Sequence, residues 1–213
     1  MSEQQLQQTP SQTIGPFFAY SLTAAQYNYN YNSIINGSLI NDDAEGELIY
    51  ITGCIFDGNG NTISDAMIEL WQADATGNYI TQYPNNSISQ YPNLSISQSP
   101  NPPISQLPFK GFGRLGTGIN NDHRFTFTTI KPGSINGNAP HINVILFMRG
   151  SLRTLFTRLY FSDEANDNDP LLNAVDAERR HTLIASKNIA RENIHYQFDI
   201  HLQGERETVF FDV

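Results

Sequence analysis

Residues 131–150 (KPGSINGNAPHINVILFMRG) gather polar side chains that could do chemistry. If residues 141–149 form a strand, alternate side chains share a face, and His141, Asn143 and Arg149 lie on the same one. The opposite face would then be core, made of Ile142, Val144, Leu146 and Met148. Because an imidazole can bind a metal and a guanidinium can stabilise negative charge, the polar face is a candidate site. A partly exposed edge strand with satisfied polar groups explains the same pattern, and the residues alone favour it.

Most other catalytic chemistries lack their residues in this chain. One cysteine, Cys54, and five scattered histidines give neither a zinc-ligand spacing nor an internal disulfide. There is no Gly-x-Ser-x-Gly elbow and no glycine-rich phosphate loop, although the composition does not exclude a Ser-His-Asp triad. The acidic stretch 163–169 (DEANDND) resembles a calcium loop, but Ala165 stands at its third place, and Asn173 and Ala174 stand near its twelfth. A solvated loop is the better interpretation of that stretch.

Strands must hold the polar face in place, and the hydrophobic pattern predicts several of them. Alternating and β-branched runs indicate strands at 48–56, 66–73, 124–130, 141–149, 156–161, 196–202 and 208–211. The sequence Asp57–Gly60 (DGNG) is typical of a hairpin turn, and residues 173–185 could hold one short helix. Seven or eight short strands separated by turn signals predict an all-β fold. We expect a β-sandwich with long loops and at most one or two short helices.

We expect residues 1–213 to form a single domain, with residues 1–46 as an N-terminal arm and loops. Residues 80–108 carry a tandem octapeptide repeat, with copies ITQYPNNS, ISQYPNLS, ISQSPNPP and a partial ISQLP. A proline at the fifth place of every copy is incompatible with a helix or a central strand. We interpret the repeat as a surface loop insertion lengthened by duplication, and a binding role for it stays open.

The charge of the chain excludes some partners. Its formal net charge is −9 and its sequence pI is about 4.8, whereas proteins that bind nucleic acid or an anionic membrane surface need a basic face. The chain has no long apolar run that could span a bilayer, and its first ten residues lack the pattern of a signal peptide. With a single cysteine, these features predict a cytoplasmic protein.

Several longer motifs resemble those of one family. They are TPSQTIGP at residues 9–16, FDGNG at 56–60, IELWQAD at 68–74, APHIN at 139–143, LFMRG at 146–150 and QGERETVFFD at 203–212. The resemblance that they mark extends over nearly the whole chain, apart from the repeat and residues 21–46. In this order they resemble the intradiol ring-cleaving dioxygenases, and in particular the α-type chains of heteromeric members.

This resemblance implies a metal and a partner. Family members cleave a catechol ring between its two hydroxyls with Fe³⁺ and O₂, and two Tyr and two His hold the iron, since hard ferric iron suits phenolates and imidazoles. In this chain Tyr79 and His141 match two of the four ligand positions, whereas Ile135 and Asn143 stand at the other two. The resemblance therefore implies a chain without a complete iron site, paired with a β-type chain that holds the Fe³⁺.

The resemblance also implies roles for other residues. Thr13, Gly15 and Pro16 would line the substrate pocket, and Arg149 would support catalysis at the partner's site. An extended strand would separate Arg149 from His141 by about 26 Å, so the two residues would serve different sites. The implied substrates are 3,4-dihydroxybenzoate and O₂, the implied product is 3-carboxy-cis,cis-muconate, and several αβ pairs would assemble into a larger oligomer.

Two alternatives remain open from the sequence. One is a self-sufficient intradiol dioxygenase that acts on a catechol, which would need all four ligands. The other is a non-catalytic β-sandwich binding module, with the repeat as its recognition loop.

Overall fold

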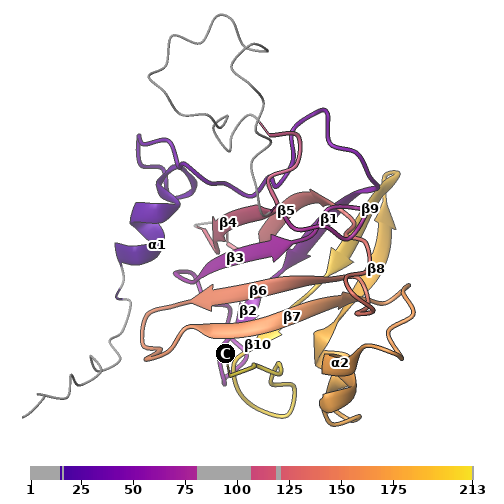
Figure 1. Cartoon of the computed structure of the whole chain (residues 1–213). Coiled ribbons are helices and arrows are strands. Elements are labelled where there is room, and N and C mark those ends of the chain that lie inside the picture. Colours follow the sequence, from indigo (N-terminus) through magenta and orange to yellow (C-terminus); the bar gives the residue numbers. More distant parts are fainter. Residues whose placement is uncertain (1–14, 16, 81–106, 119–120, 213) are drawn as a thin grey trace, which may run out of the picture.

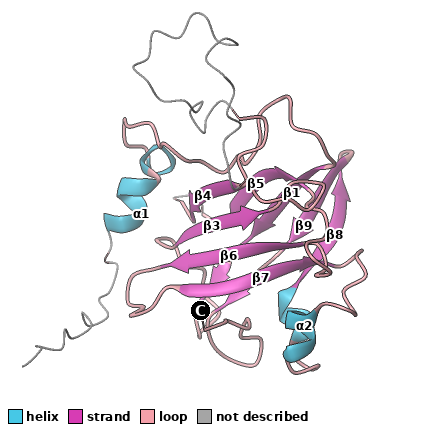
Figure 2. Ribbon diagram, viewed as in Figure 1, coloured by secondary structure: helices cyan, strands magenta, loops and turns pink. Residues whose placement is uncertain are grey.

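The computed structural model describes residue 15 and residues 17–80, 107–118 and 121–212. Thr13, Pro16 and residues 81–106 of the repeat lie outside the described residues. The fold consists of strands with short helices at its margins (Figure 1 and Figure 2), which confirms the predicted all-β sandwich.

The first half of the chain supplies α1 (Phe17–Leu22), η1 (Ala24–Tyr27), β1 (Leu48–Gly53), β2 (Ile55–Phe56), β3 (Met67–Gln72) and β4 (Phe112–Gly116). The second half supplies β5 (Phe125–Ile130), β6 (His141–Phe147), β7 (Leu155–Phe161), α2 (Pro170–Ala174), η4 (Arg180–Leu183), β8 (Ile184–Ala190), β9 (Asn193–Gln197) and β10 (Ile200–His201). The elements η1 and η4 are short 3₁₀ helices.

One long sheet folds back on itself to make both layers of the sandwich. Its eight strands follow the order β4-β3-β6-β7-β8-β9-β1-β5, and β2 and β10 form a small separate pair. Only two residue pairs join β7 to β8, Tyr160 with Ile184 and Phe161 with Ala185, and the sheet passes from one layer to the other there. The alternation predicted for β6 is confirmed, because Ile142, Val144 and Leu146 are buried in the core. The core joins both layers through residues such as Ile49, Ile51, Ile68, Leu70, Phe127, Leu159 and Tyr196.

Residues 173–185, where one short helix was expected, hold only the end of α2 and the short 3₁₀ helix η4. The side chain of Asp169 accepts a hydrogen bond from the backbone N–H of Leu172, and Pro170 opens the helix, so α2 begins earlier than expected. Val175 then adopts an extended conformation and ends α2. The apolar residues that follow include Ile184, which pairs with β7 and starts β8. Pairing across the sheet, which a local pattern does not encode, therefore decides this segment.

Several other strands differ from the prediction. The strand expected at 141–149 ends at Phe147, so Arg149 lies in the turn that follows it. The segment expected as a strand at 208–211 forms only an isolated bridge between Phe211 and Phe156. The strand β4 was not predicted, because its two glycines weaken the strand pattern. Those glycines give space, since a Cβ on Gly113 would lie 2.4 Å from the side chain of Leu39.

The acidic stretch is more than a solvated loop, because its first carboxylate ties several strands together. Asp163 accepts hydrogen bonds from Lys131 at 3.0 Å, from Lys187 at 2.8 Å and from the hydroxyl of Tyr196 at 3.0 Å. Lys131 also pairs with Glu164 at 2.6 Å. Burial alone would raise the pKa of Asp163, but the hydrogen bonds from Lys187 and Lys131 lower it well below its ordinary value.

Replacing Asp163 by Asn should lower the free energy of unfolding by about 1 kcal/mol near neutral pH, a modest value because the side chain keeps 30% exposure and solvent screens it. Since the folded-state pKa lies below the unfolded one, the carboxylate stabilises the fold above about pH 4, and this stabilisation is lost as the pH falls through the folded pKa. Denaturant titrations over this range should show a gap between the two proteins that closes in acid. Asp167→Asn removes an exposed charge and is the control. A gap that does not change with pH would contradict the electrostatic explanation.

Candidate functional site

The outer face of β6 carries the polar side chains that the sequence singled out. His141 and Asn143 lie on that face, and Asn143 is opposite Arg158 of β7 and Trp71 of β3. Tyr79 reaches the same place from the loop that follows β3, where the Asn143 Nδ2 group donates a hydrogen bond to the Tyr79 hydroxyl at 2.9 Å. The structure thus brings together three of the four expected ligand positions.

Two loops approach each other backbone to backbone to position Tyr79. The Asp74 carboxylate accepts hydrogen bonds from the backbone N–H groups of Thr76 and Asn78, which closes the turn after β3. The N–H of Gly133 donates to the carbonyl of Asp74 at 2.9 Å. Gly77 has a φ of +85°, and a Cβ there would lie 2.1 Å from the Ser134 carbonyl oxygen. Only glycine fits at this contact.

The fourth expected ligand position, Ile135, begins a tight turn. Ile135 and Asn138 exchange backbone hydrogen bonds of 3.3 and 2.8 Å around Asn136 and Gly137. Asn136 and Gly137 have φ values of 49° and 83°, as the Asn-Gly sequence favours in a two-residue hairpin. The backbone therefore presents residue 135 in an ordered loop, but an isoleucine side chain has no atom that could bind a metal.

A polar network runs from Tyr79 across the sheet to the start of α2. Arg158 Nε donates to Asn143 Oδ1 at 3.2 Å, and an Arg158 Nη group lies 3.4 Å from the Tyr160 hydroxyl. Tyr160 in turn donates to the Asp169 carboxylate at 2.9 Å. Burial raises the pKa of Tyr160 above its ordinary value, so this hydroxyl stays protonated and is the donor. The same carboxylate accepts hydrogen bonds from the backbone N–H groups of Ala139 and Leu172.

His141 is a neutral, fixed imidazole in this setting. Its side chain is buried with 2% exposure, and its Nδ1–H donates to the Ala139 carbonyl at 2.8 Å. Burial lowers the pKa of His141, and the positive charge of Arg158 acts in the same direction. A hydrogen bond of this kind at Nδ1 fixes the tautomer and the orientation of the ring.

The side chains at this place do not fit ferric iron. The four positions offer one phenol, one imidazole, one amide and one aliphatic group. The amide of Asn143 is already used on both sides, since it donates to Tyr79 and accepts from Arg158. A trivalent cation requires anionic donors, and the network places a guanidinium there instead. Within the described ranges, no cluster of three or more His, Cys, Asp or Glu side chains could hold a metal ion.

Arg149 and α1 lie at the other end of β6. Arg149 forms an ion pair with Asp65 at 3.1 Å, and its side chain is 63% exposed. Gly15 has a φ of +77° and lies two residues before the start of α1, whose Phe18 packs on Phe147 with ring centroids 5.4 Å apart. Figure 1 shows α1 beside the end of β6 that leads to Arg149. The structure therefore separates this pair from Tyr79 and His141.

The residues of the IELWQAD motif at 68–74 have mainly structural roles, which the sequence did not predict. Glu69 is buried and forms an ion pair with Arg114 of β4 at 2.6 Å. Gln72 connects the two layers, because it donates to the Ile130 carbonyl and accepts from the Thr129 hydroxyl, both at 2.9 Å. Trp71 is 49% exposed and lies with its ring centroid 5.0 Å from that of Tyr79.

Arg158 is the site residue that sequence reasoning missed. Alternation along the predicted strand 156–161 places Arg158 and Tyr160 on one face, so the signal was present in the sequence. The role of Arg158 becomes visible only from the register between β6 and β7, which brings Arg158 opposite Asn143.

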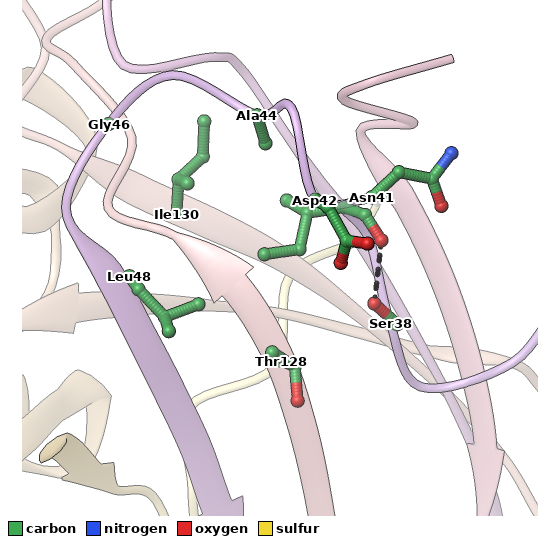
Figure 3. Close-up of a pocket in the computed structure, with 9 residues that line it drawn as sticks. Ser38, Asn41, Asp42, Ala44, Gly46, Leu48, Thr128 and Ile130 are labelled. Carbon is green, nitrogen blue, oxygen red and sulfur yellow. Dashed lines mark hydrogen bonds between the residues drawn. The ribbon is translucent and has the colours of Figure 1, made fainter. Parts of the chain in front are cut away.

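A groove of about 630 Å³ lies elsewhere, between the loop at residues 38–46 and the edge of β1 and β5 (Figure 3). Its lining includes Asp42, Leu48 and Thr128, and the hydroxyl of Ser38 donates to the carbonyl of Ile40 at 2.8 Å. A smaller pocket of about 290 Å³ adjoins Trp71. Neither of these hollows includes His141, Asn143 or Arg158 in its lining.

Comparisons with known proteins agree on one family. The model of a family described as "Dioxygenase" matches residues 26–204. The chain is 43% identical to the protocatechuate 3,4-dioxygenase alpha chain of Burkholderia cepacia, over 98% of each chain. It is 29% identical to the beta chain of the enzyme from the same organism, over 89% of this chain and 77% of the beta chain. The solved dioxygenase domain of a carbohydrate-binding fusion from Streptomyces sp. SirexAA-E shares the fold, with a TM-score of 0.54 and 22% identity over 94% of this chain and 99% of that one. The chain therefore belongs to the intradiol ring-cleavage dioxygenase family.

Proposed function

We propose that this chain is the α-type subunit of a heteromeric protocatechuate 3,4-dioxygenase. The main support for the proposal comes from the side chains that stand at the expected metal-ligand positions. Asn143 and Arg158 form a hydrogen-bonded network where the family has metal ligands, in a chain that is otherwise similar to an alpha chain over its full length. A separate β-type chain, like the related beta chain of Burkholderia cepacia, then holds the Fe³⁺.

The proposed reaction breaks the ring bond between the two hydroxyl-bearing carbons of 3,4-dihydroxybenzoate. Both atoms of O₂ enter the product, which is 3-carboxy-cis,cis-muconate. The partner's ferric iron supplies the activation of substrate and O₂, and this chain supplies part of the pocket wall. Thr13, Gly15 and Pro16 line that pocket, and α1, which follows them, packs through Phe18 on Phe147 near the end of β6 that leads to Arg149.

Arg149 supports the partner's site with its positive charge. It lies in the turn beyond β6, on the far side of Phe147 from His141, so it cannot act at the degenerate positions of its own chain. The Arg149 side chain is 63% exposed, although the Asp65 carboxylate with which it pairs is only 13% exposed. The exposed guanidinium can therefore face a partner and stabilise negative charge that develops there.

The assembly is built from αβ pairs in the cytoplasm. The free thiol of Cys54 is buried and fits a reducing compartment. None of the helices in the described ranges is long and apolar enough to cross a membrane.

The isolated chain should be colourless and inactive on 3,4-dihydroxybenzoate, even with added Fe³⁺, because Tyr79 and His141 alone cannot hold the metal. Co-expression with a β-type chain should give a complex with about one iron per αβ pair, visible tyrosinate-to-iron absorption and ring cleavage. Iron analysis, visible spectra and O₂ uptake check these expectations. Colour and turnover from the chain alone, with no partner detected by mass spectrometry, would favour a self-sufficient enzyme. Failure to form any complex would favour the non-catalytic binding module.

Replacing Arg149 by Ala in the αβ complex should lower the turnover rate by up to about 100-fold, because one positioned charge is removed from the reacting centre. Assembly and iron content should be unchanged, since the Arg149 side chain is 63% exposed and lies in a turn outside the core. The matched control is Arg153→Ala, which removes another exposed cation from the same loop between β6 and β7. Steady-state kinetics with 3,4-dihydroxybenzoate provide the measurement. Wild-type kinetics in the Arg149 variant would remove this residue from the mechanism.

A further inference from the structure

The guanidinium of Arg158 contacts one of the four positions where the family holds its metal. In the antiparallel pairing of β6 and β7, Arg158 is directly opposite Asn143, and Tyr160 is directly opposite His141. Arg158 Nε lies 3.2 Å from Asn143 Oδ1, and an Nη group lies 3.4 Å from the Tyr160 hydroxyl. A permanent cation therefore contacts one degenerate ligand position and is adjacent to another.

No carboxylate neutralises this cation in the part of the chain that the structure describes. The ion pairs found there use other arginines and lysines, and both hydrogen-bond partners of Arg158 are neutral groups. The nearest acid in the network, Asp169, is one step removed. The oxygens of Asp169 accept hydrogen bonds from the Tyr160 hydroxyl and from two backbone N–H groups. The positive charge of Arg158 is thus directed at the site without a counter-charge.

Arg158 also fixes the orientation of the amide at position 143. Because Asn143 Oδ1 accepts from Arg158, its Nδ2 group is the one that faces Tyr79 and donates to the phenol oxygen. That oxygen is the atom that would bind a metal as phenolate. Among the four positions, only the Tyr79 phenol could become an anionic ligand. The hydrogen bonds from Arg158 to Asn143 and from Asn143 to Tyr79 already use its oxygen inside the chain.

We propose that Arg158 excludes metal cations from this chain, independently of the missing ligands, so that restoring the ligand side chains alone would not restore a metal site. The proposal rests on the assignment of Tyr79, Ile135, His141 and Asn143 as former ligand positions. Charge repulsion at a few ångströms acts strongly on a trivalent ion in a partly buried setting. A chain with such a cation keeps the iron of an αβ pair in the partner alone.

The test restores the ligand set with and without the cation in the full-length chain. The reference variant is Ile135→Tyr/Asn143→His, and the test variant adds Arg158→Gln. We expect Fe³⁺ to bind the reference at least about 10-fold more weakly than the test variant, in line with the effect of groups adjacent to metal ligands. Equilibrium dialysis against Fe³⁺ and the tyrosinate-to-iron absorption band measure this binding without requiring turnover.

Two matched variants separate charge from other effects. Adding Arg158→Lys to the reference retains the cation and should leave iron binding weak. Adding Arg153→Gln removes an arginine that is 79% exposed and should change nothing. Equal iron affinity in the reference and the Arg158→Gln variant would overturn the proposal, as would tight binding in the Arg158→Lys variant or no binding in the Arg158→Gln variant.

A second background guards against misfolding of the multiple variants. Asn143→His alone leaves residue 135 unchanged, and its Zn²⁺ affinity can be compared with and without Arg158→Gln after thermal unfolding has shown that both fold. We expect the Arg158→Gln protein to bind Zn²⁺ more tightly, and equal affinities would contradict the proposal. These measurements need neither partner nor substrate, so their failure leaves the proposed function standing, whereas the co-expression experiment tests that function alone.

Discussion

The register of β6 between β3 and β7 is the constraint on which the rest of the structure depends. Ile142, Val144 and Leu146 must face the core, and a slip of one residue would turn all of them to solvent. Once they are buried, His141 and Asn143 have to lie on the opposite face of β6. The antiparallel pairings then dictate their neighbours, Tyr160 and Arg158. Burial of three aliphatic side chains therefore decides which polar groups meet on the opposite face.

The outer face of this layer is divided into two ends with different chemistry. At one end a network of neutral and charged groups links the loop after β3 to the start of α2, and each of its buried polar groups has a partner, as buried polar groups require. At the other end α1 packs on Phe147, and the Arg149 side chain beyond it is exposed. The Glu69–Arg114 pair lies between the two ends and joins β3 to β4. The two ends of this face therefore differ in how many of their polar groups are used in internal hydrogen bonds.

Local patterns were sufficient for the parts of the fold that burial decides. The period-two alternation of β6 and the Asp-Gly-Asn-Gly turn could be predicted because each depends on neighbouring residues only. The segment after Asp169 could not, since Ile184 joins a strand that is distant in sequence. The role of Arg158 also required the pairing of β6 with β7. The roles of Thr13, Gly15, Pro16 and Arg149 remain predictions, because they concern a surface that a partner would complete.

The ends of the octapeptide insertion are anchored to the sandwich on both sides. Before it, Tyr79 is held by Asn143 and Trp71. At its far end, the carbonyl of Leu107 accepts a hydrogen bond from the side-chain amide of Asn41, and the N–H of Lys110 donates to the carbonyl of Leu39. All of these anchoring residues lie outside residues 81–106. The number of octapeptide units between the two anchors can therefore change without altering the register of the strands.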